Sequence, residues 1–169
     1  TGLVTGVPEK ELSEYRMFCQ EVFGKKEISF GQNRKMCYLR FGDNLYMVSD
    51  EMPSVKGLKV LRPGLHVGTL KKNRFEPSHG LALALSPDEV LRVWNLCYEE
   101  NSHSNEEGAC RKDGSFDKRV VSAYLKGETF PAEGQKGWYL ICVDGFGIGW
   151  GKLAGGLMKN HYPRGLRHG

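Results

Sequence analysis

Several features of membrane and secreted proteins are missing from this sequence. No apolar run approaches the roughly 20 residues that a membrane-spanning helix needs. The first residues, Thr1-Gly2-Leu3-Val4, do not form a charged region followed by an apolar segment, so no signal peptide is predicted. A starting methionine is also missing, from which we expect a fragment of a longer protein or a trimmed chain.

The cysteines and histidines form no reactive or metal-binding pattern. The cysteine count is odd, no C-x-x-C pair occurs, and no cysteine is next to a proline. No two histidines have H-x-x-x-H spacing. We therefore expect reduced thiols in a cytoplasmic protein, no metal site and no catalytic residue in this chain. The cysteines are Cys19, Cys37, Cys97, Cys110 and Cys142.

A complete nucleotide-binding unit is missing too. The run from Gly149 to Ala154 matches G-x-G-x-x-A, a glycine pattern of cofactor-binding folds. It lies too near the C-terminus for a unit of about 30 residues, and no acidic residue follows Asp144. Glycines for tight turns between short strands are the better interpretation.

The composition is that of a folded, mildly basic protein. An apolar fraction of 40% is typical of a chain with a packed core. The formal charge of +4 and the pI near 8.8 permit a polyanionic partner but do not require one. The placement of the charges therefore matters more than their sum.

Hydrophobic periodicity predicts an α+β fold. Apolar positions recur at helical spacing from Pro8 to Phe23, and Gly24 is suited to end that helix. Ser86-Pro87-Asp88-Glu89 has the pattern of a capping box, which predicts a second helix to about Glu100. Residues 101–114 are polar and predict a linker or a long surface loop. Strands are predicted at 36–41 and 45–48 around a turn at 42–44, and at 58–61, 65–70, 120–125 and 137–143.

The segment from Gly68 to His79 is a first candidate site. Lys71, Lys72 and Arg74 place three cations within four positions at the end of a predicted strand, where they can meet a phosphate backbone. Phe75 is available to stack on a base. An ordinary solvated turn is the alternative, with Glu76 neutralising a neighbour and Phe75 in the core. The sequence does not decide between them.

The tail from Gly145 to Gly169 is a second candidate site, because it is basic and contains no carboxylate. Its cations are interleaved with Trp150 and Tyr162, and cations with aromatic rings are typical of RNA recognition. In the structural alternative both rings are core residues of a small barrel, which is the favoured interpretation for Trp150. The cations are Lys152, Lys159, Arg164 and Arg167.

The same two segments carry a family resemblance. The run Gly68-x-x-Lys71-Lys72-x-Arg74-Phe75-Glu76-Pro77-Ser78-His79 is followed by Leu81-Ala82. The ending is Gly149-Trp150-Gly151-Lys152, then Gly156-x-x-Lys159-Asn160-x-Tyr162-Pro163-x-Gly165-Leu166-Arg167. In this order they resemble the region after the catalytic domain, with its terminal PUA-like module, in RsmF-like Sun-family RNA cytosine-5 methyltransferases. The resemblance covers the chain from about residue 30 to the end.

This resemblance implies a domain plan and a parent activity. It implies a linker helix region at 1–28, a mixed α/β subdomain at 29–100, a linker at 101–114, and a small β-barrel-like PUA-type module at 115–169. The parent enzyme would methylate carbon 5 of cytosine in ribosomal RNA, or in transfer RNA, with S-adenosylmethionine. The catalytic cysteines of the family occur in Pro-Cys and Thr-Cys contexts, and both contexts are absent here. We therefore expect no catalysis and no cofactor in this fragment.

What the resemblance carries over is RNA docking. We expect the cations to contact phosphate, Tyr162 a base or sugar, and Asn160 a base edge or a structural turn. The leading hypothesis is a substrate-positioning region that works with its own catalytic domain, as a monomer without a membrane partner. The alternatives are a structural cap on the catalytic domain and an enzyme with an unfamiliar site. The matched positions are Lys71, Lys72, Arg74, Lys152, Lys159, Asn160, Tyr162, Arg164 and Arg167.

Overall fold

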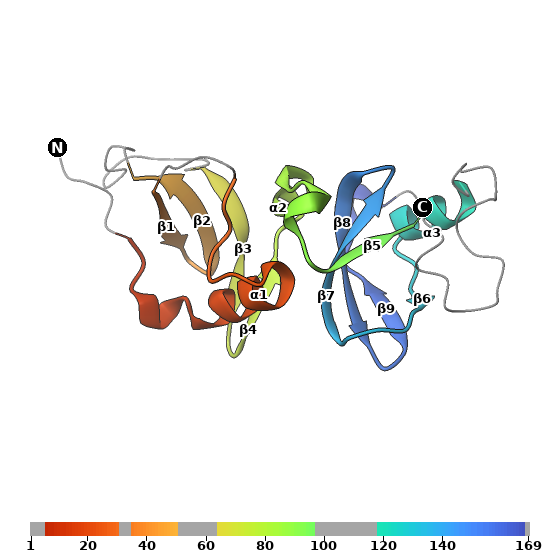
Figure 1. Cartoon of the computed structure of the whole chain (residues 1–169), viewed down its shortest axis with the longest axis horizontal. Helices are drawn as coiled ribbons and strands as arrows, with labels where there is room; N and C mark the ends of the chain where they lie inside the picture. The colour runs from red at the N-terminus through yellow and green to blue at the C-terminus, as the bar shows by residue number, and fades with distance from the viewer. Residues whose placement is uncertain (1–5, 31–34, 51–63, 97–117, 168–169) are drawn as a thin grey trace. The chain divides into compact units, whose positions relative to one another are not determined.

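The chain folds into two compact units (Figure 1). The structure is a computed structural model that describes residues 6–30, 35–50, 64–96 and 118–167. The first unit comprises Thr1–Gln20 and Gly24–Leu81, and the second comprises Glu21–Phe23 and Ala82–Gly169. Among the described residues, no helix is long and apolar enough to span a membrane.

The predicted N-terminal helix is confirmed. A short 3-10 helix, η1 (Glu9–Glu11), precedes α1 (Ser13–Phe23). Gly24 ends α1 in the left-handed conformation, with φ at 67°, which glycine adopts without the steric cost of a side chain. The sequence therefore predicted both the helix and the glycine that ends it.

The strands of the first unit form one antiparallel sheet in the order β1-β2-β3-β4. Phe41 is opposite Asn44, so Gly42 and Asp43 make the turn of the first hairpin. The predicted hairpin and the predicted strand at 65–70 are confirmed, whereas the strand predicted at 58–61 lies outside the described residues. The strands are β1 (Met36–Phe41), β2 (Asn44–Ser49), β3 (Leu65–Lys71) and β4 (Arg74–Pro77).

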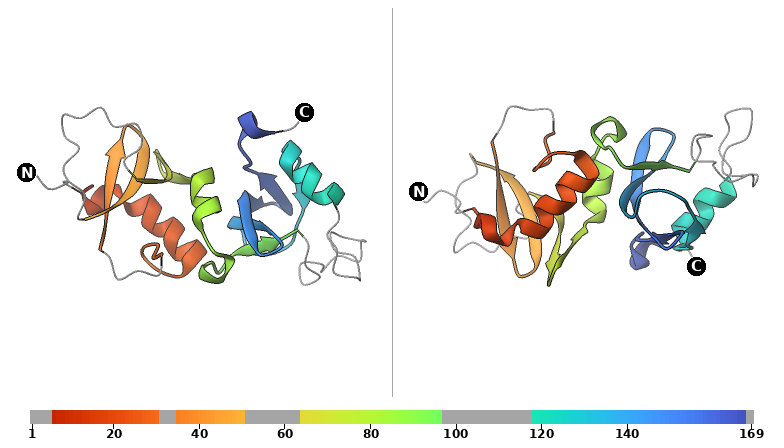
Figure 2. Two further views of the ribbon diagram at one scale, coloured as in Figure 1. Left: turned by 90° about the horizontal axis from the view of Figure 1, so that it is seen from above. Right: turned by 60° about the horizontal axis from the view of Figure 1, so that its bottom comes forward.

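Helix α1 covers one face of this sheet (Figure 2). The rings of Tyr15 and Phe18 pack against Phe75, with centroids 5.3 and 4.9 Å away. The Tyr15 and Tyr38 hydroxyls share a hydrogen bond of 2.9 Å in the buried layer. Burial raises the pKa of both hydroxyls, so both stay protonated and the bond fixes the helix on the sheet.

The predicted helix from Ser86 to Glu100 is wrong where the structure describes it. After α2 (His79–Ala84), the capping-box segment makes only the 3-10 turn η2 (Pro87–Glu89), and the Ser86 side chain makes no capping bond. The chain then becomes extended and forms β5 (Val93–Asn95). Residues 97–100 and the predicted linker at 101–114 lie outside the described residues, so the predicted domain boundaries stay predictions.

Pairing with a distant strand explains this correction. β5 pairs in parallel with β7 (Gly137–Val143), and the Leu140 and Leu96 amides donate to the Arg92 and Cys142 carbonyls. These bonds satisfy backbone groups that a helix would have satisfied internally. Tertiary pairing therefore overrode the local capping signal.

The second unit contains a curled five-stranded sheet with the order β5-β7-β8-β9-β6. The strand predicted at 137–143 is confirmed as β7, whereas the strand predicted at 120–125 is wrong, because α3 occupies it. Val120, Val121, Tyr124 and Leu125 repeat at helical spacing and cover the inside of the sheet. The elements are α3 (Lys118–Lys126), β6 (Phe130–Pro131), β8 (Phe146–Ala154), β9 (Leu157–Asn160) and η4 (Arg164–Leu166).

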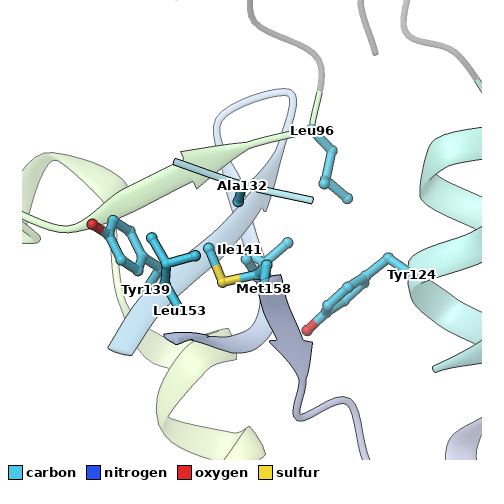
Figure 3. Close-up of a cluster of buried hydrophobic side chains, with 7 residues drawn as sticks. All are labelled: Leu96, Tyr124, Ala132, Tyr139, Ile141, Leu153 and Met158. Atoms are coloured by element: carbon cyan, nitrogen blue, oxygen red, sulfur yellow. The ribbon is translucent and has the colours of Figure 1, made fainter. Parts of the chain in front are cut away.

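The inside of this curled sheet is an apolar core (Figure 3). Tyr124 projects from α3 toward strand residues that include Ile141 and Met158. A Cβ at Gly151 would lie 2.7 Å from the Met158 sulfur, so a larger residue there would force the Met158 side chain to shift. The helices and two sheets confirm the predicted α+β class, and the curled sheet fits a PUA-like module.

Candidate nucleic-acid interface

The outer face of the second sheet carries a row of three side chains from neighbouring strands. Trp138 on β7 is opposite Lys152 on β8, and Lys152 is opposite Lys159 on β9. Side chains directly opposite each other share one face of a sheet. Leu153 and Met158, which follow and precede the two lysines, point into the core. Since successive side chains alternate, the lysines point away from the core.

The two lysines stand opposite each other, and no carboxylate of the described residues pairs with them. Opposite Cβ atoms lie about 4.5–5.5 Å apart, and like charges at such positions are destabilising. Neither Lys152 nor Lys159 forms an ion pair within the described part of the chain. An anion between their ammonium groups would remove the repulsion and gain charge-assisted hydrogen bonds. The pair is therefore a candidate phosphate contact.

Aromatic rings fix one end of this row. The Lys152 Nζ atom lies 5.1 Å from the centroid of the Trp138 ring, a distance at which the cation is attracted to the ring face. His161 packs edge-on against the same ring, with centroids 4.5 Å apart, and is itself exposed. Neither Trp138 nor His161 was among the predicted site residues. The Trp138 ring thus holds the Lys152 ammonium group in place, whereas the Lys159 side chain is exposed.

Asn160 has a structural role in the protein. Its Nδ2 atom donates to the carbonyls of Tyr124, at 2.8 Å, and Glu128, at 3.0 Å. Its Oδ1 atom accepts from the Tyr162 amide at 2.8 Å. The carbonyls at the end of a helix lack internal partners, and Asn160 supplies donors at the end of α3. Of the two roles predicted for Asn160, this geometry favours the structural turn.

Arg167 and Tyr162 are also engaged within the fold. Arg167 Nε donates to the Tyr162 carbonyl at 3.1 Å, and the guanidinium packs over Gly127, just past the end of α3. A cation is favourable at the C-terminal end of a helix. The Tyr162 ring packs against Tyr124 with centroids 5.6 Å apart. Arg164 is different, because its side chain is exposed in η4.

The basic turn of the first unit is only partly neutralised. Lys71 Nζ lies 2.9 Å and Arg74 Nε 3.4 Å from the Glu76 carboxylate. Lys72 makes no ion pair among the described residues. Phe75 is 5% exposed and belongs to the core, so it is not a stacking face. Glu76 and Phe75 thus behave as expected for an ordinary solvated turn. The Glu76 carboxylate alone, however, does not balance the charges of Lys71, Lys72 and Arg74.

A cleft of about 400 Å³ opens beside this turn. Its cation Arg40 is held by Glu11 at 3.2 Å and by Asp43 at 3.5 Å. These carboxylates offset the cations that share the cleft, so it is a poor site for a phosphate. The lining residues are Glu11, Glu14, Arg40, Asp43, Leu70, Lys71 and Lys72.

Two family models match this sequence, and each covers mainly one of the two units. Residues 17–85 match the first C-terminal domain of the RsmF rRNA methyltransferase, and residues 114–168 match the PUA domain of the RsmF methyltransferase. The chain is an RsmF-like C-terminal region. The family resemblance drawn from the two motif blocks is therefore confirmed. Strand β5 lies outside both matches, although it completes the second sheet of this RsmF-like region.

The buried thiols of the RsmF-like region are poor nucleophiles. Burial raises the pKa of Cys19 and of Cys142 to about 12, so both are protonated at neutral pH. Both side chains are fully buried. Their environment is that of core residues, and they cannot reach a base.

The structure thus sorts the predicted residues without bringing them all together. Lys152 and Arg167 are half-buried, whereas the other cations of the predicted set are exposed, namely Lys71, Lys72, Arg74, Lys159 and Arg164. Asn160, Tyr162 and Arg167 support the fold around α3. The Asp144-Gly145 turn alone would place Trp138 opposite Gly151, and a β-bulge next to Ile141 shifts the register so that Trp138 is opposite Lys152, which the sequence did not signal.

Proposed function

We propose that this region binds structured ribosomal RNA and holds a cytosine in place for methylation at carbon 5 by a catalytic domain elsewhere in the parent protein. Both matched domains are accessory domains of an rRNA methyltransferase family, which supports this function. In the proposal, S-adenosylmethionine supplies the methyl group within that catalytic domain. Transfer RNA is the alternative substrate, and the protein acts in the cytoplasm as a monomer.

The observation that carries the proposal is the opposed pair Lys152 and Lys159. Protein stability alone disfavours two like charges at this position, because they repel each other across β8 and β9. Phosphate oxygens would compensate both charges together. Contacts to phosphate also anchor an RNA without reading its sequence.

A separate anchoring region suits the chemistry of base methylation. An enzyme that modifies a base must take it out of the stack, and this costs a few kcal/mol. Phosphate contacts on the flanking RNA can offset this cost, since they supply sequence-independent affinity. The region would therefore contribute affinity and register, while the catalytic domain selects the cytosine.

The proposal is tested by RNA binding across a salt series. The wild-type region and the double variant Lys152→Glu/Lys159→Glu are titrated with a ribosomal RNA helix between 50 and 200 mM salt, the range over which phosphate contacts lose affinity. A plot of log K against log salt has a negative slope, and each lost phosphate contact makes it shallower by about 1. We therefore expect the slope of the double variant to be shallower than that of the wild type by about 2. Arg164→Glu tests the exposed cation of η4 in the same way.

The matched control is Lys25→Glu, which changes an exposed lysine of the first unit that makes no ion pair among the described residues. Its slope should equal that of the wild type. A wild-type affinity no greater than that of an unrelated protein of equal charge would reject RNA docking. Equal salt slopes in all variants would mean that the RNA phosphates are not bound by Lys152 and Lys159 on β8 and β9.

A structural cap on the catalytic domain is the second candidate. It is favoured by large apolar side chains on the surface, with Leu91 71% and Phe146 72% exposed in the second unit. Such residues would be covered if the catalytic domain packed on them. Under this function, Leu91→Ser and Phe146→Ser would weaken association with the catalytic domain and leave the salt-dependent RNA binding unchanged.

A further inference from the structure

The sheet of the first unit has a second face, opposite the one that α1 covers. Leu45 and Met47 of β2 are buried on the helix side, so Tyr46 between them points to the other side. His66 of β3 is opposite Tyr46, and Tyr46 also contacts the Phe41 ring of β1. Three aromatic side chains from three adjacent strands therefore lie together on this face.

Leu39 and Val48 lie on the same face and are buried, so the face is open to solvent only at the end that carries these rings. Phe41 is 43% exposed, and Tyr46 and His66 are half-buried. The Tyr46 and His66 rings lie 5.0 Å apart and are tilted by 34°, while the Phe41 ring stands at 83° to Tyr46 at 5.9 Å. His66 Nε2 is within 3.0 Å of the Gly68 carbonyl, which fixes its ring. The cluster is rigid, because each ring is held by another ring or by the backbone.

Polar and basic groups continue the same face toward the β3–β4 turn. Thr69 is opposite Asn44 on one side and Glu76 on the other, and Thr69 Oγ1 donates to Asn44 Oδ1 at 3.4 Å. Lys71 and Arg74 form the next pair, two residues further along the strand. Two residues correspond to about 7 Å along a strand. Along this face toward the β3–β4 turn, the aromatic rings are therefore followed by the hydrogen-bonding side chains Asn44 and Thr69 and then by the cations Lys71 and Arg74.

We propose that this outer face binds an unpaired stretch of RNA, with bases stacking on Phe41 and Tyr46, Asn44 and Thr69 at base edges or sugars, and the backbone at Lys71 and Arg74. The proposal deepens the proposed function, on which it rests for its RNA partner. Four-stranded sheets with exposed aromatic rings bind single-stranded RNA in this manner, because every base has a face that can stack.

The chemistry of the face selects this occupant over a protein segment. An apolar peptide would cover the Asn44 and Thr69 side chains and leave their polar groups outside the mutual hydrogen bond without partners, at a cost in desolvation. Bases have donors and acceptors at their edges for these groups. Lys71 and Arg74 share the single Glu76 carboxylate on this face. Burial lowers the pKa of His66, so its ring is neutral at physiological pH and adds stacking surface to the cluster.

The test compares two RNAs of equal length, one fully paired and one with an unpaired loop. The variant is Phe41→Leu/Tyr46→Leu, which keeps apolar side chains and removes the rings. We expect the affinity for the loop RNA to fall by roughly 10-fold to 100-fold, as loss of stacking does at such sites. Binding of the paired RNA should change less than twofold. A 2-aminopurine base in the loop, whose fluorescence responds to stacking, gives an independent signal.

Two controls keep folding separate from binding. Phe146→Leu removes an exposed ring of the second unit and should leave the affinity for both RNAs unchanged. Tyr46→Phe keeps the ring and removes the hydroxyl, so it should bind the loop RNA as the wild type does. Thermal unfolding of each variant identifies any that fail to fold, and Phe41→Leu alone is the milder replacement for a destabilised double variant.

The outcomes distinguish this inference from the proposed function. Wild-type binding to the loop RNA that survives loss of both rings would overturn the stacking face and leave the lysine pair in place. Loss of affinity in the ring variant, with no effect of Lys152→Glu/Lys159→Glu, would support the stacking face and overturn the lysine pair. An equal loss for both RNAs would show backbone contact without stacking, and a wild-type protein that binds neither RNA would overturn both.

Discussion

The two units place aromatic rings and cations in opposite ways. In the second unit Trp138 and Trp150 are 5% and 1% exposed, and the lysines of β8 and β9 lie outside without a carboxylate partner in the described residues. In the first unit Lys71 and Arg74 at the β3–β4 turn share Glu76, and the Phe41 ring that contacts Tyr46 is 43% exposed. The second unit thus presents a pair of lysines, and the first presents a cluster of aromatic rings beside cations that share a carboxylate.

Under the proposed function, this difference divides two physical tasks of RNA binding between the two units. Contacts from unpaired lysines weaken steeply with salt, because bound phosphates release counterions. Stacking on rings depends on unpaired bases and much less on salt. The second unit should therefore give affinity for any RNA helix, and the first should give preference for exposed bases.

The largest effect is expected from a comparison of two phenylalanines of the first unit, the buried Phe75 and the exposed Phe41. Phe75 is 5% exposed and packs on Tyr15 and Phe18, so Phe75→Ala should lower the free energy of unfolding by about 3–5 kcal/mol. Phe41 is 43% exposed, so Phe41→Ala should lower it by about 1 kcal/mol or less. Urea unfolding, monitored by circular dichroism, measures both values.

RNA binding should show the reverse order for these variants. Phe41→Ala should weaken binding of a loop RNA, whereas Phe75→Ala should change it only through loss of folded protein. If Phe75→Ala weakens RNA binding at a temperature where it is fully folded, the division between core rings and surface rings is wrong for this unit.

A smaller effect is expected at the opposed lysines. Lys159→Glu replaces a like-charged cross-strand pair with an opposite-charged one, so the free energy of unfolding should rise by about 0.5 kcal/mol at low salt. The gain should shrink as salt screens the charges. The same variant should bind RNA less tightly, which is the sign of a site that gives up stability for function.

Lys159→Gln is the control for this trade-off. It removes the repulsion without adding attraction, so its stability should lie between those of the wild type and Lys159→Glu. A fall in stability in both variants would mean that Lys159 already has a favourable partner, and the argument for an anion between the lysines would then fail.

Elements with strong local signals were predictable from the sequence. The helix before Gly24 and the hairpin around Gly42-Asp43 have both a hydrophobic period and a residue suited to the turn. At these places local preference and tertiary packing favour the same structure. The family resemblance was equally local, since it rests on two motif blocks that the family models confirm.

Elements decided by distant partners were not predictable. The capping-box segment before Val90 has good helical signals, but β7 requires the residues that follow it as a parallel strand. Val120 and Val121 favour a strand locally, yet their spacing with Tyr124 covers the inside of the curled sheet as a helix. Short apolar runs fit both structures, and contacts far along the chain decide between them.

The candidate site divides in the same way. Basic composition identified Lys152 and Lys159, but only the strand register shows that they are opposite each other. Asn160 and Arg167 have the residue types of RNA contacts, and both are bound to backbone groups near the end of α3. Residue type indicates what a side chain can bind, and the fold decides whether it is available.

The smallest expected effect concerns pH and the ring face of the first unit. Burial lowers the pKa of His66, whereas the unfolded chain returns it to about 6.5. Below this value the unfolded state binds more protons than the folded state, so the free energy of unfolding should fall as pH drops from 7 toward the lower folded pKa. His79, whose pKa burial also lowers, contributes in the same direction.

Unfolding midpoints in urea at several pH values between 7.5 and 5 should show a weaker pH dependence in His66→Gln than in the wild type. An unchanged dependence would mean that His66 is as free to take up a proton in the folded protein as in the unfolded chain, and the neutral ring face at Tyr46 would lose that support.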